Sequence, residues 1–375
     1  MLVSWKGIIM NILKITGKSY KNFPEITYKV GSGRLYGRSG EGKSNMLSTI
    51  TACFVNCDMD GHKLVPLPDD AQTGWVKIEY EENGEFHEAY RTWTRSDSGF
   101  TSASSLTKKI DKSLFLAIAN PLYVFGLDNS ERIDFLIDIA YYNYKGNIID
   151  ELSGDVPVEI MDFAKHFEDG ITLPQLRNLA KKTRLDMKAN KKQHETFNAQ
   201  LLILEQVENS FEIVNELSAQ VIALESQIQK QEEIIRVIDT INSLLLKNAI
   251  ELIAPAFFIT SFTDDGKILC SGVPADRLSS GEKLECGLDI ANALAGRCDI
   301  VPPTLIDDAT ARGHKDIDMT PFANLTQIIT TAYADVDTLC EYHNGMLHGL
   351  DKSWKKPTDT TFRPEVCIEM IPYDS

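Results

Sequence analysis

The chain has 375 residues, of which 43% are apolar and 25% charged, and its formal net charge is −16. This composition is ordinary for a globular protein of two or three domains. No apolar stretch approaches the ~20 residues of a membrane span, so we expect no transmembrane helix. The seven scattered cysteines indicate neither a disulfide framework nor a CxxC zinc site, so we expect a protein of the reducing cytoplasm. The negative charge repels a polyanion, so any contact with nucleic acid requires a local basic patch.

The beginning of the chain has the pattern of an α/β segment. Short apolar runs between turn residues predict strands at 12–15, 26–30 and 35–36, and a helix at 44–53. The alternation over 75–80, the turn at Asn83-Gly84 and a second run at 86–93 predict a β-hairpin. No small-residue cleavage site follows the N-terminus, so we expect no signal peptide. Met10 is an alternative start, because the pattern begins just after it.

A phosphate-binding motif lies between the predicted strand at 35–36 and the predicted helix. The pattern GxxxxGK[ST] is matched by Gly37-Arg38-Ser39-Gly40-Glu41-Gly42-Lys43-Ser44. Glycines allow successive backbone N–H groups to point at a phosphate, and the following helix presents its positive N-terminus to the same group. Lys43 is expected to reach the β- and γ-phosphates, and the Ser44 hydroxyl to bind Mg²⁺. We predict ATP and magnesium as ligands, with Gly37 through Asn45 as nucleotide-binding residues.

Two long helices are predicted in the middle of the chain. Thr172 and Gln175 form a capping box that begins the first helix, which runs to about Val207. The second carries an apolar heptad seam, broken only by Gln231, at Val214, Leu217, Val221, Leu224, Ile228, Ile235 and Ile238. A turn at 208–210 would place Asn190 opposite about Ile228, near Gln231. We predict an antiparallel coiled-coil hairpin with arms about 50 Å long; the alternative is a two-helix part of a compact helical domain.

A basic stripe follows the first of these helices. Its cations recur at 4-3-4-3 spacing on one outer face: Arg177, Lys181, Arg184, Lys188 and Lys191. Such a stripe can follow a phosphate backbone, which makes DNA a predicted partner. The alternative is an ordinary solvated face of a coiled coil.

Two further motifs follow in the C-terminal α/β segment. Leu278-Ser279-Ser280-Gly281-Glu282-Lys283 precedes a predicted helix at 284–295, and its serines could equally be simple N-caps. The apolar run 303–306 ends in Asp307 and Asp308, as in a buried parallel strand with acids at its carboxyl edge. Asp307 could then hold magnesium and Asp308 polarise a water, although an isolated Asp-Asp pair can also be a solvated turn.

The order of these motifs resembles the SMC, SbcC and RecF group of ABC ATPases, over nearly the whole chain. The resemblance implies an α/β fold in which residues 1–170 and 251–375 form one ATPase head and residues 171–250 are an inserted coiled-coil hairpin. It implies that Gly37 to Ser44 is the Walker A loop, Asp307 the Walker B magnesium acid and Asp308 the catalytic base. Ser280 and Gly281 would contact the γ-phosphate held by a second copy in an ATP-sandwiched homodimer.

The chain also departs from that group. Asn120 stands where a Q-loop Gln, a magnesium ligand, is expected. Asp308 replaces the usual Glu, and one methylene less could displace the water-activating oxygen by about 1 Å, which predicts slow hydrolysis. The stretch 309–314 differs from the usual D-loop, and Ala332 occupies the place of a switch His. The short hairpin without a zinc hook resembles compact bacteriophage members, which would place the protein in the host cytoplasm.

These features predict an ATPase that dimerises on ATP and acts in DNA repair, recombination or DNA-end processing with a nuclease or recombination partner. The alternative is an ATP-gated DNA clamp or protein scaffold with little or no hydrolysis. A P-loop kinase is disfavoured, because it would need neither the LSSGEK motif nor a coiled coil.

Overall fold

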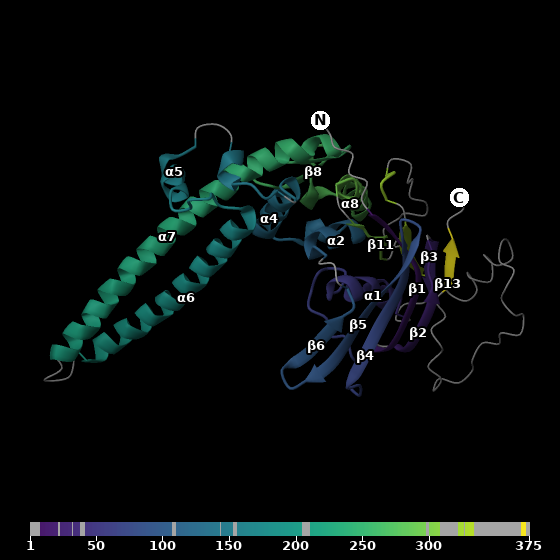
Figure 1. The fold of residues 1–375 in the computed structure, drawn as a ribbon, viewed down its shortest axis with the longest axis horizontal. Helices are drawn as coiled ribbons and strands as arrows, with labels where there is room; N and C mark the ends of the chain where they lie inside the picture. Colours follow the sequence, from purple (N-terminus) through teal and green to yellow (C-terminus); the bar gives the residue numbers. More distant parts are fainter. Residues whose placement is uncertain are drawn as a thin grey trace, which may run out of the picture. The chain divides into compact units, whose positions relative to one another are not determined.

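The computed structural model describes residues 8–21, 23–31, 33–37, 42–106, 110–142, 144–152, 156–204, 211–297, 300–307, 322–325, 327–333 and 369–372. Two compact units are present. The first comprises Met1–Asp128, Ala256–Ser261 and Lys267–Ser375, and the second comprises Asn129–Pro255 and Phe262–Gly266 (Figure 1). The division predicted from the sequence, at residues 170 and 250, has other boundaries and stays a prediction.

The larger sheet of the first unit is mainly antiparallel. Its strand order is β10-β1-β4-β5-β6, and β2 also pairs with β1. The bounds are β1 (Ile8–Tyr20), β2 (Phe23–Lys29), β4 (Thr73–Glu82), β5 (Glu85–Ser96), β6 (Gly99–Ser104) and β10 (Ile300–Val301). Alternate residues of β4 are buried, as expected for a sheet with one covered face. The predicted hairpin is confirmed, since β4 and β5 pair across Asn83 and Gly84, both at positive φ.

A second sheet contains the strand that precedes the phosphate-binding motif. Its order is β11-β12-β3-β13, formed by β3 (Gly33–Gly37), β11 (Thr304–Ile306), β12 (Ile328–Tyr333) and β13 (Glu369–Pro372). β11, β12 and β3 run parallel, and β13 is antiparallel to β3. A small sheet follows the order β7-β8-β9, with β7 (Thr260–Phe262), β8 (Ile268–Cys270) and β9 (Val273–Pro274).

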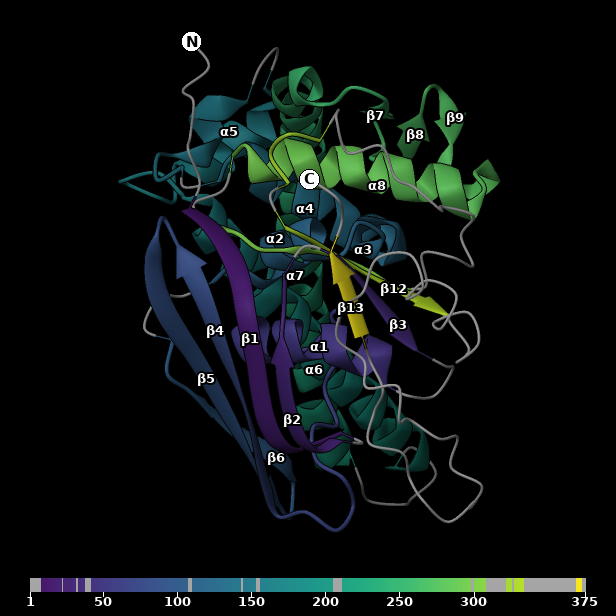
Figure 2. The same cartoon turned by 90° about the vertical axis from the view of Figure 1, so that its right-hand side faces the viewer.

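Helix α1 (Lys43–Val55) lies between the two larger sheets (Figure 2). One apolar core joins α1 to both of them, because Ile50 is buried in the same cluster as Ile78 of β4 and Ile329 of β12. The sheets are also joined by a buried amide. Ile12 N donates to Gln327 Oε1 at 2.6 Å, and Gln327 Nε2 donates to Ile12 O at 2.8 Å. The first unit also contains α2 (Lys112–Ala119), α3 (Tyr123–Gly126), α8 (Ser280–Ala295) and the 3-10 turn η3 (Ala275–Arg277).

The second unit is helical. Its elements are α4 (Asn129–Ala140), η1 (Ile148–Glu151), α5 (Val158–Ala164), α6 (Leu173–Leu204) and α7 (Phe211–Ile253), and the short turn η2 (Ala254–Ala256) follows α7. In the part of the chain that the structure describes, no helix combines the length and apolarity needed to cross a membrane.

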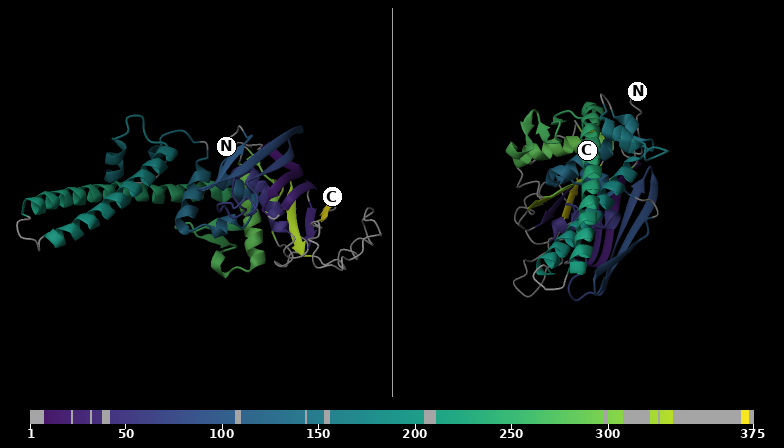
Figure 3. Two further views of the ribbon diagram at one scale, coloured as in Figure 1. Left: turned by 90° about the horizontal axis from the view of Figure 1, so that it is seen from below. Right: turned by 90° about the vertical axis from the view of Figure 1, so that its left-hand side faces the viewer.

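Helices α6 and α7 run side by side in opposite directions (Figure 3). Arg184 pairs with Asp239 at one level, and His194 contacts Glu225 at another. Between them, Asn190 Nδ2 donates to Gln231 Oε1 at 3.2 Å, so the polar residue that breaks the seam of the second helix meets Asn190, near the predicted register. The Gln175 half of the predicted capping box is present, since Thr172 N and the Thr172 hydroxyl both donate to Gln175 Oε1, each at 2.8 Å. The turn predicted at 208–210 lies outside the described residues.

Candidate nucleotide-binding site

The carboxyl ends of β3 and β11 lie at the same edge of the parallel sheet. β12 separates the two strands, so they are about 10 Å apart at the usual strand spacing. Ile306 pairs with Thr330, and Thr330 pairs with Arg34. Asp307 is therefore level with the residue after Arg34, about 7 Å along the strand direction from Gly37. Two motifs far apart in the sequence thus follow the same edge of one sheet.

The N-terminus of α1 faces this edge without a side-chain cap from its N-cap residue. That residue is Gly42, at φ 98° and ψ 15°, and the first turn of α1 contains no acidic residue. A left-handed conformation suits glycine and is costly for other residues. By contrast, Asp111 caps α2 and Ser279 caps α8. An uncapped helix N-terminus that follows a strand is suited to an anion such as phosphate.

Only part of the predicted Walker A loop belongs to the described chain. Gly37 ends β3, and Gly42, Lys43, Ser44 and Asn45 begin α1, with Ser44 exposed and Lys43 half-buried. Arg38, Ser39, Gly40 and Glu41 lie outside the described residues. Of the two acids, Asp307 is half-buried directly after β11, whereas Asp308 lies outside the described residues, as does the stretch 309–314.

Ser280 and Gly281 form the first turn of α8. Ser279 is the N-cap, and the capping box is complete, because Glu282 N donates to Ser279 Oγ at 3.3 Å and Ser279 N donates to Glu282 Oε2 at 2.7 Å. Hydrogen bonds to the Ser279 side chain and backbone lower the pKa of the Glu282 carboxyl. The capping interpretation therefore holds for Ser279. Ser280 lies beside it and is exposed.

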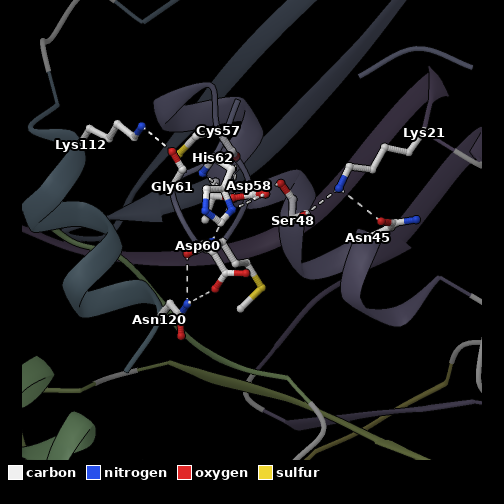
Figure 4. Close-up of polar contacts among 12 residues, drawn as sticks. Lys21, Asn45, Ser48, Cys57, Asp58, Asp60, Gly61, His62, Lys112 and Asn120 are labelled. Atoms are coloured by element: carbon white, nitrogen blue, oxygen red, sulfur yellow. Dashed lines mark hydrogen bonds and ion pairs between the residues drawn. The ribbon is translucent and has the colours of Figure 1, made fainter. Parts of the chain in front are cut away.

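Asn120 is buried and engaged by the chain itself (Figure 4). Its Nδ2 donates to Met59 O at 3.0 Å and to Asp60 Oδ1 at 3.3 Å, while its Oδ1 accepts from Leu122 N at 3.0 Å. These bonds hold the loop that follows α1. The assignment of Asn120 as a magnesium ligand stays a prediction, since ligation would compete with the bond from Leu122.

A lysine that the sequence did not single out lies against α1. Lys21 Nζ donates to Asn45 Oδ1 at 3.2 Å and to Ser48 Oγ at 3.1 Å. It comes from the turn between β1 and β2, which brings it to the helix that begins with the motif. Nothing in the local pattern around Lys21 marks it, because the contact depends on the pairing of distant segments.

The basic stripe on α6 is largely neutralised by nearby acids. Arg177 pairs with Asp134 and Asp138 of α4, while Arg184 and Lys191 each pair with a carboxylate of α7 at 2.7 Å. Burial raises the pKa of the Asp134 carboxyl, although Arg177 acts in the opposite direction. Within the described chain, Lys181 and Lys188 make no ion pair within 4.0 Å. These two cations are the part of the stripe that is left for an external anion.

The oxygen donors at the sheet edge suit magnesium. A hydroxyl at Ser44 and a carboxylate at Asp307 are hard ligands of the kind that Mg²⁺ binds together with phosphate oxygens and water. Among the described residues, no cluster of three or more His, Cys, Asp or Glu side chains could hold a metal by itself. The donor set therefore fits a metal that arrives with a phosphate ligand better than a resident metal.

Comparisons with known proteins find similarity only among solved structures. No family model matches the chain, and no curated protein matches it. The chain is similar to an SMC head domain with an extended coiled coil, bound to the C-terminal domain of ScpA, from Pyrococcus furiosus: 15% identity, 88% of this chain and 91% of that chain, TM-score 0.39. It is similar to the recombination mediator protein RecF with ATP: 14% identity, 90% and 94% coverage, TM-score 0.41. An SMC head domain from Thermotoga maritima aligns at 14% identity, 86% and 89% coverage, and TM-score 0.31.

These solved structures are SMC and RecF proteins, which belong to the group that the motif order resembles. Identities of 15% or less and TM-scores of at most 0.41 carry no inference about the site. What the site can bind follows from this chain's own residues.

Proposed function

We propose that the protein binds and hydrolyses ATP as an ABC-type ATPase. The observation that supports this most is the shared sheet edge, where β3 leads into the uncapped N-terminus of α1 and β11 leads into Asp307. A phosphate chain bound at α1 would lie within reach of both segments, since only β12 separates them. Residues 1–170 and 251–375 form the proposed head, and 171–250 the coiled-coil arm.

The proposed roles follow from the chemistry of each residue. Backbone N–H groups at the start of α1 bind phosphate oxygens, and Lys43 neutralises charge on the β- and γ-phosphates. Ser44 and Asp307 hold Mg²⁺, which when bound withdraws charge from the phosphates. Asp308 accepts a proton from the attacking water. Hydrolysis is slow, because an Asp carboxylate reaches less far than the Glu of related ATPases.

Ser280 is the proposed contact to a second copy. It is exposed in the first turn of α8, so its hydroxyl is available to donate to an anion. A γ-phosphate held by the partner head would complete the site, so the active form is an ATP-bound homodimer. We propose DNA repair, recombination or DNA-end processing as its role, with a nuclease or recombination protein as partner.

The experiment that tests the proposal measures Mg-ATP binding and turnover by the full chain, with and without duplex DNA. Lys43→Ala is expected to weaken ATP binding at least tenfold, about the value of one charge-assisted contact in the site. Asp308→Ala should retain binding and lose turnover by about a hundredfold, the lower end for removal of a general base. Asp97→Asn, an exposed carboxylate of the same unit, is the matched control.

The outcomes separate the two candidate functions. DNA-stimulated turnover that disappears in Asp308→Ala supports the ATPase. Tight ATP binding without turnover in the wild type would instead support the clamp or scaffold, which the Asp at the base position favours. A wild-type chain that does not bind Mg-ATP would refute both.

A further inference from the structure

The turn between β1 and β2 is hydrogen-bonded to α1, the helix whose N-terminus forms part of the proposed phosphate site. Two consecutive residues do so. Tyr20 Oη donates to Ser48 O at 3.4 Å, and Lys21 Nζ donates to Asn45 Oδ1 and Ser48 Oγ (Figure 4). The ammonium group also lies 5.8 Å from the centre of the Tyr20 ring. Asn45 and Ser48 belong to the first two turns of α1. Lys21 is thus bound to the end of the helix that carries the proposed phosphate-binding amides.

The backbone of this turn fixes where Lys21 lies. Ser19 and Lys21 have φ angles of 51° and 49°. Tyr20 pairs with Phe23, so Lys21 is the first residue of a two-residue hairpin turn, where a positive φ is usual. The turn is also held by Lys21 N, which donates to Pro66 O at 2.7 Å, and by the complete burial of Tyr20.

Without a bound ligand, the positive charge of Lys21 lies in an unfavourable environment. Burial lowers the pKa of its ammonium group, which means that the cation is poorly solvated, and Asp58 acts in the opposite direction. Asp58 is shared, because its Oδ1 accepts from Asp60 N and His62 N. Moreover, the N-terminus of a helix carries the positive end of the helix dipole, and the first turn of α1 has no acidic residue to offset a cation. A bound polyanion would instead attract both the ammonium group and the positive helix end, so the position of Lys21 would become favourable.

We propose that Lys21 is a positioning residue and second cation of the phosphate site, selective for the polyphosphate of a nucleoside triphosphate. Lys21 holds Asn45 and the first turns of α1 in the geometry that binds phosphate, and its charge adds to that of Lys43. This inference rests on the proposed function, because it assumes that the phosphates lie at the N-terminus of α1. It assigns a role to a residue outside the motif that defines the site.

The test compares Mg-ATP and Mg-ADP dissociation constants of the full chain and its variants by titration calorimetry. Lys21→Gln keeps a hydrogen-bonding group but removes the charge, Lys21→Met removes both, and Lys21→Arg keeps the charge. Lys18→Gln is the matched control, since Lys18 is an exposed lysine near the end of β1, just before this turn. For one unit charge at close range and intermediate screening, affinity for Mg-ATP should fall about fivefold to tenfold in Lys21→Gln and Lys21→Met. The fall for Mg-ADP should be smaller, and Lys21→Arg should stay within about twofold of the wild type.

Thermal melting of the same variants without nucleotide separates a role in binding from a role in folding. If Lys21 only packs the turn, Lys21→Met lowers the melting temperature and the folded protein binds ATP as the wild type does. That result, or equal affinities of Lys21→Gln and Lys18→Gln, would overturn the inference and leave the proposed function intact. Absence of Mg-ATP binding by the wild type would remove the proposed function and the inference together.

Discussion

Replacing Gln327 by Leu tests how the two large sheets are held together. The Gln327 amide is 4% exposed, and it both accepts from Ile12 N and donates to Ile12 O, 315 positions away in the chain. The pairing of β1 with β4 is irregular between Ile12 and Lys14, so the backbone of Ile12 depends on this side chain. Leu fills a similar volume and offers no polar atom. One backbone donor and one acceptor would then be buried without these partners.

The expected cost follows from those two groups. Each buried polar group left without a partner costs about 1–3 kcal/mol, so Gln327→Leu should lower the free energy of unfolding by about 2–6 kcal/mol. Urea denaturation followed by tryptophan fluorescence measures this, because Trp75 and Trp93 lie in the neighbouring strands β4 and β5. Gln72→Leu, at an exposed glutamine of the same unit, is the control. A change no larger than that of the control, within about 0.5 kcal/mol, would refute the bridging role.

Three further predictions concern other described contacts. Asp289→Asn should destabilise the first unit by about 2–4 kcal/mol in the same denaturation assay. The fully buried carboxylate accepts hydrogen bonds from the N–H groups of three successive residues, Phe258 to Thr260, and the amide nitrogen of Asn cannot accept a hydrogen bond. Because its pKa is lowered, the ionised Glu282 carboxylate stabilises α8 at pH values above 4.5, and this stabilisation is lost as the pH falls through the lowered pKa. Glu282→Gln should therefore reduce the loss of stability below about pH 5, and an unchanged dependence of stability on pH in this range would contradict the prediction. Reversal of Lys181 and Lys188 to Glu should weaken DNA binding and reduce its salt slope by about 2, whereas reversal of the paired Lys191 should have a smaller effect; equal affinity at low salt would exclude the stripe.

Local patterns predicted the elements that depend on few neighbours. The hairpin around Gly84 follows from two residues that tolerate positive φ, and the beginning of α6 follows from the reach of Gln175 back to Thr172. The approximate pairing of Asn190 with Gln231 was predictable, because a turn at 208–210 brings these two positions close together in an antiparallel hairpin.

The organisation of the site could be predicted only in part. Two motifs with the context of strand ends indicated a shared edge, but the insertion of β12 between β3 and β11 is a non-local pairing that no short pattern encodes. The contacts of Lys21 and Asn120 were missed for the same reason. For the basic stripe, spacing identified a common face but could not show that carboxylates from α4 and α7 reach it.

The position of β12 has a consequence for synthesis of the chain on the ribosome. β3 is made within the first 37 residues, yet its parallel neighbour is completed only at residue 333. The hairpins of β1, β2, β4, β5 and β6 can pair as soon as they emerge, because their partners are close in sequence. The sheet of the proposed nucleotide-binding site must wait until β12 is made, and until then both flanks of β3 lack their partners, because its other neighbour, β13, is made later still. Chaperone dependence and aggregation of nascent chains should therefore be greatest for lengths that end before β12.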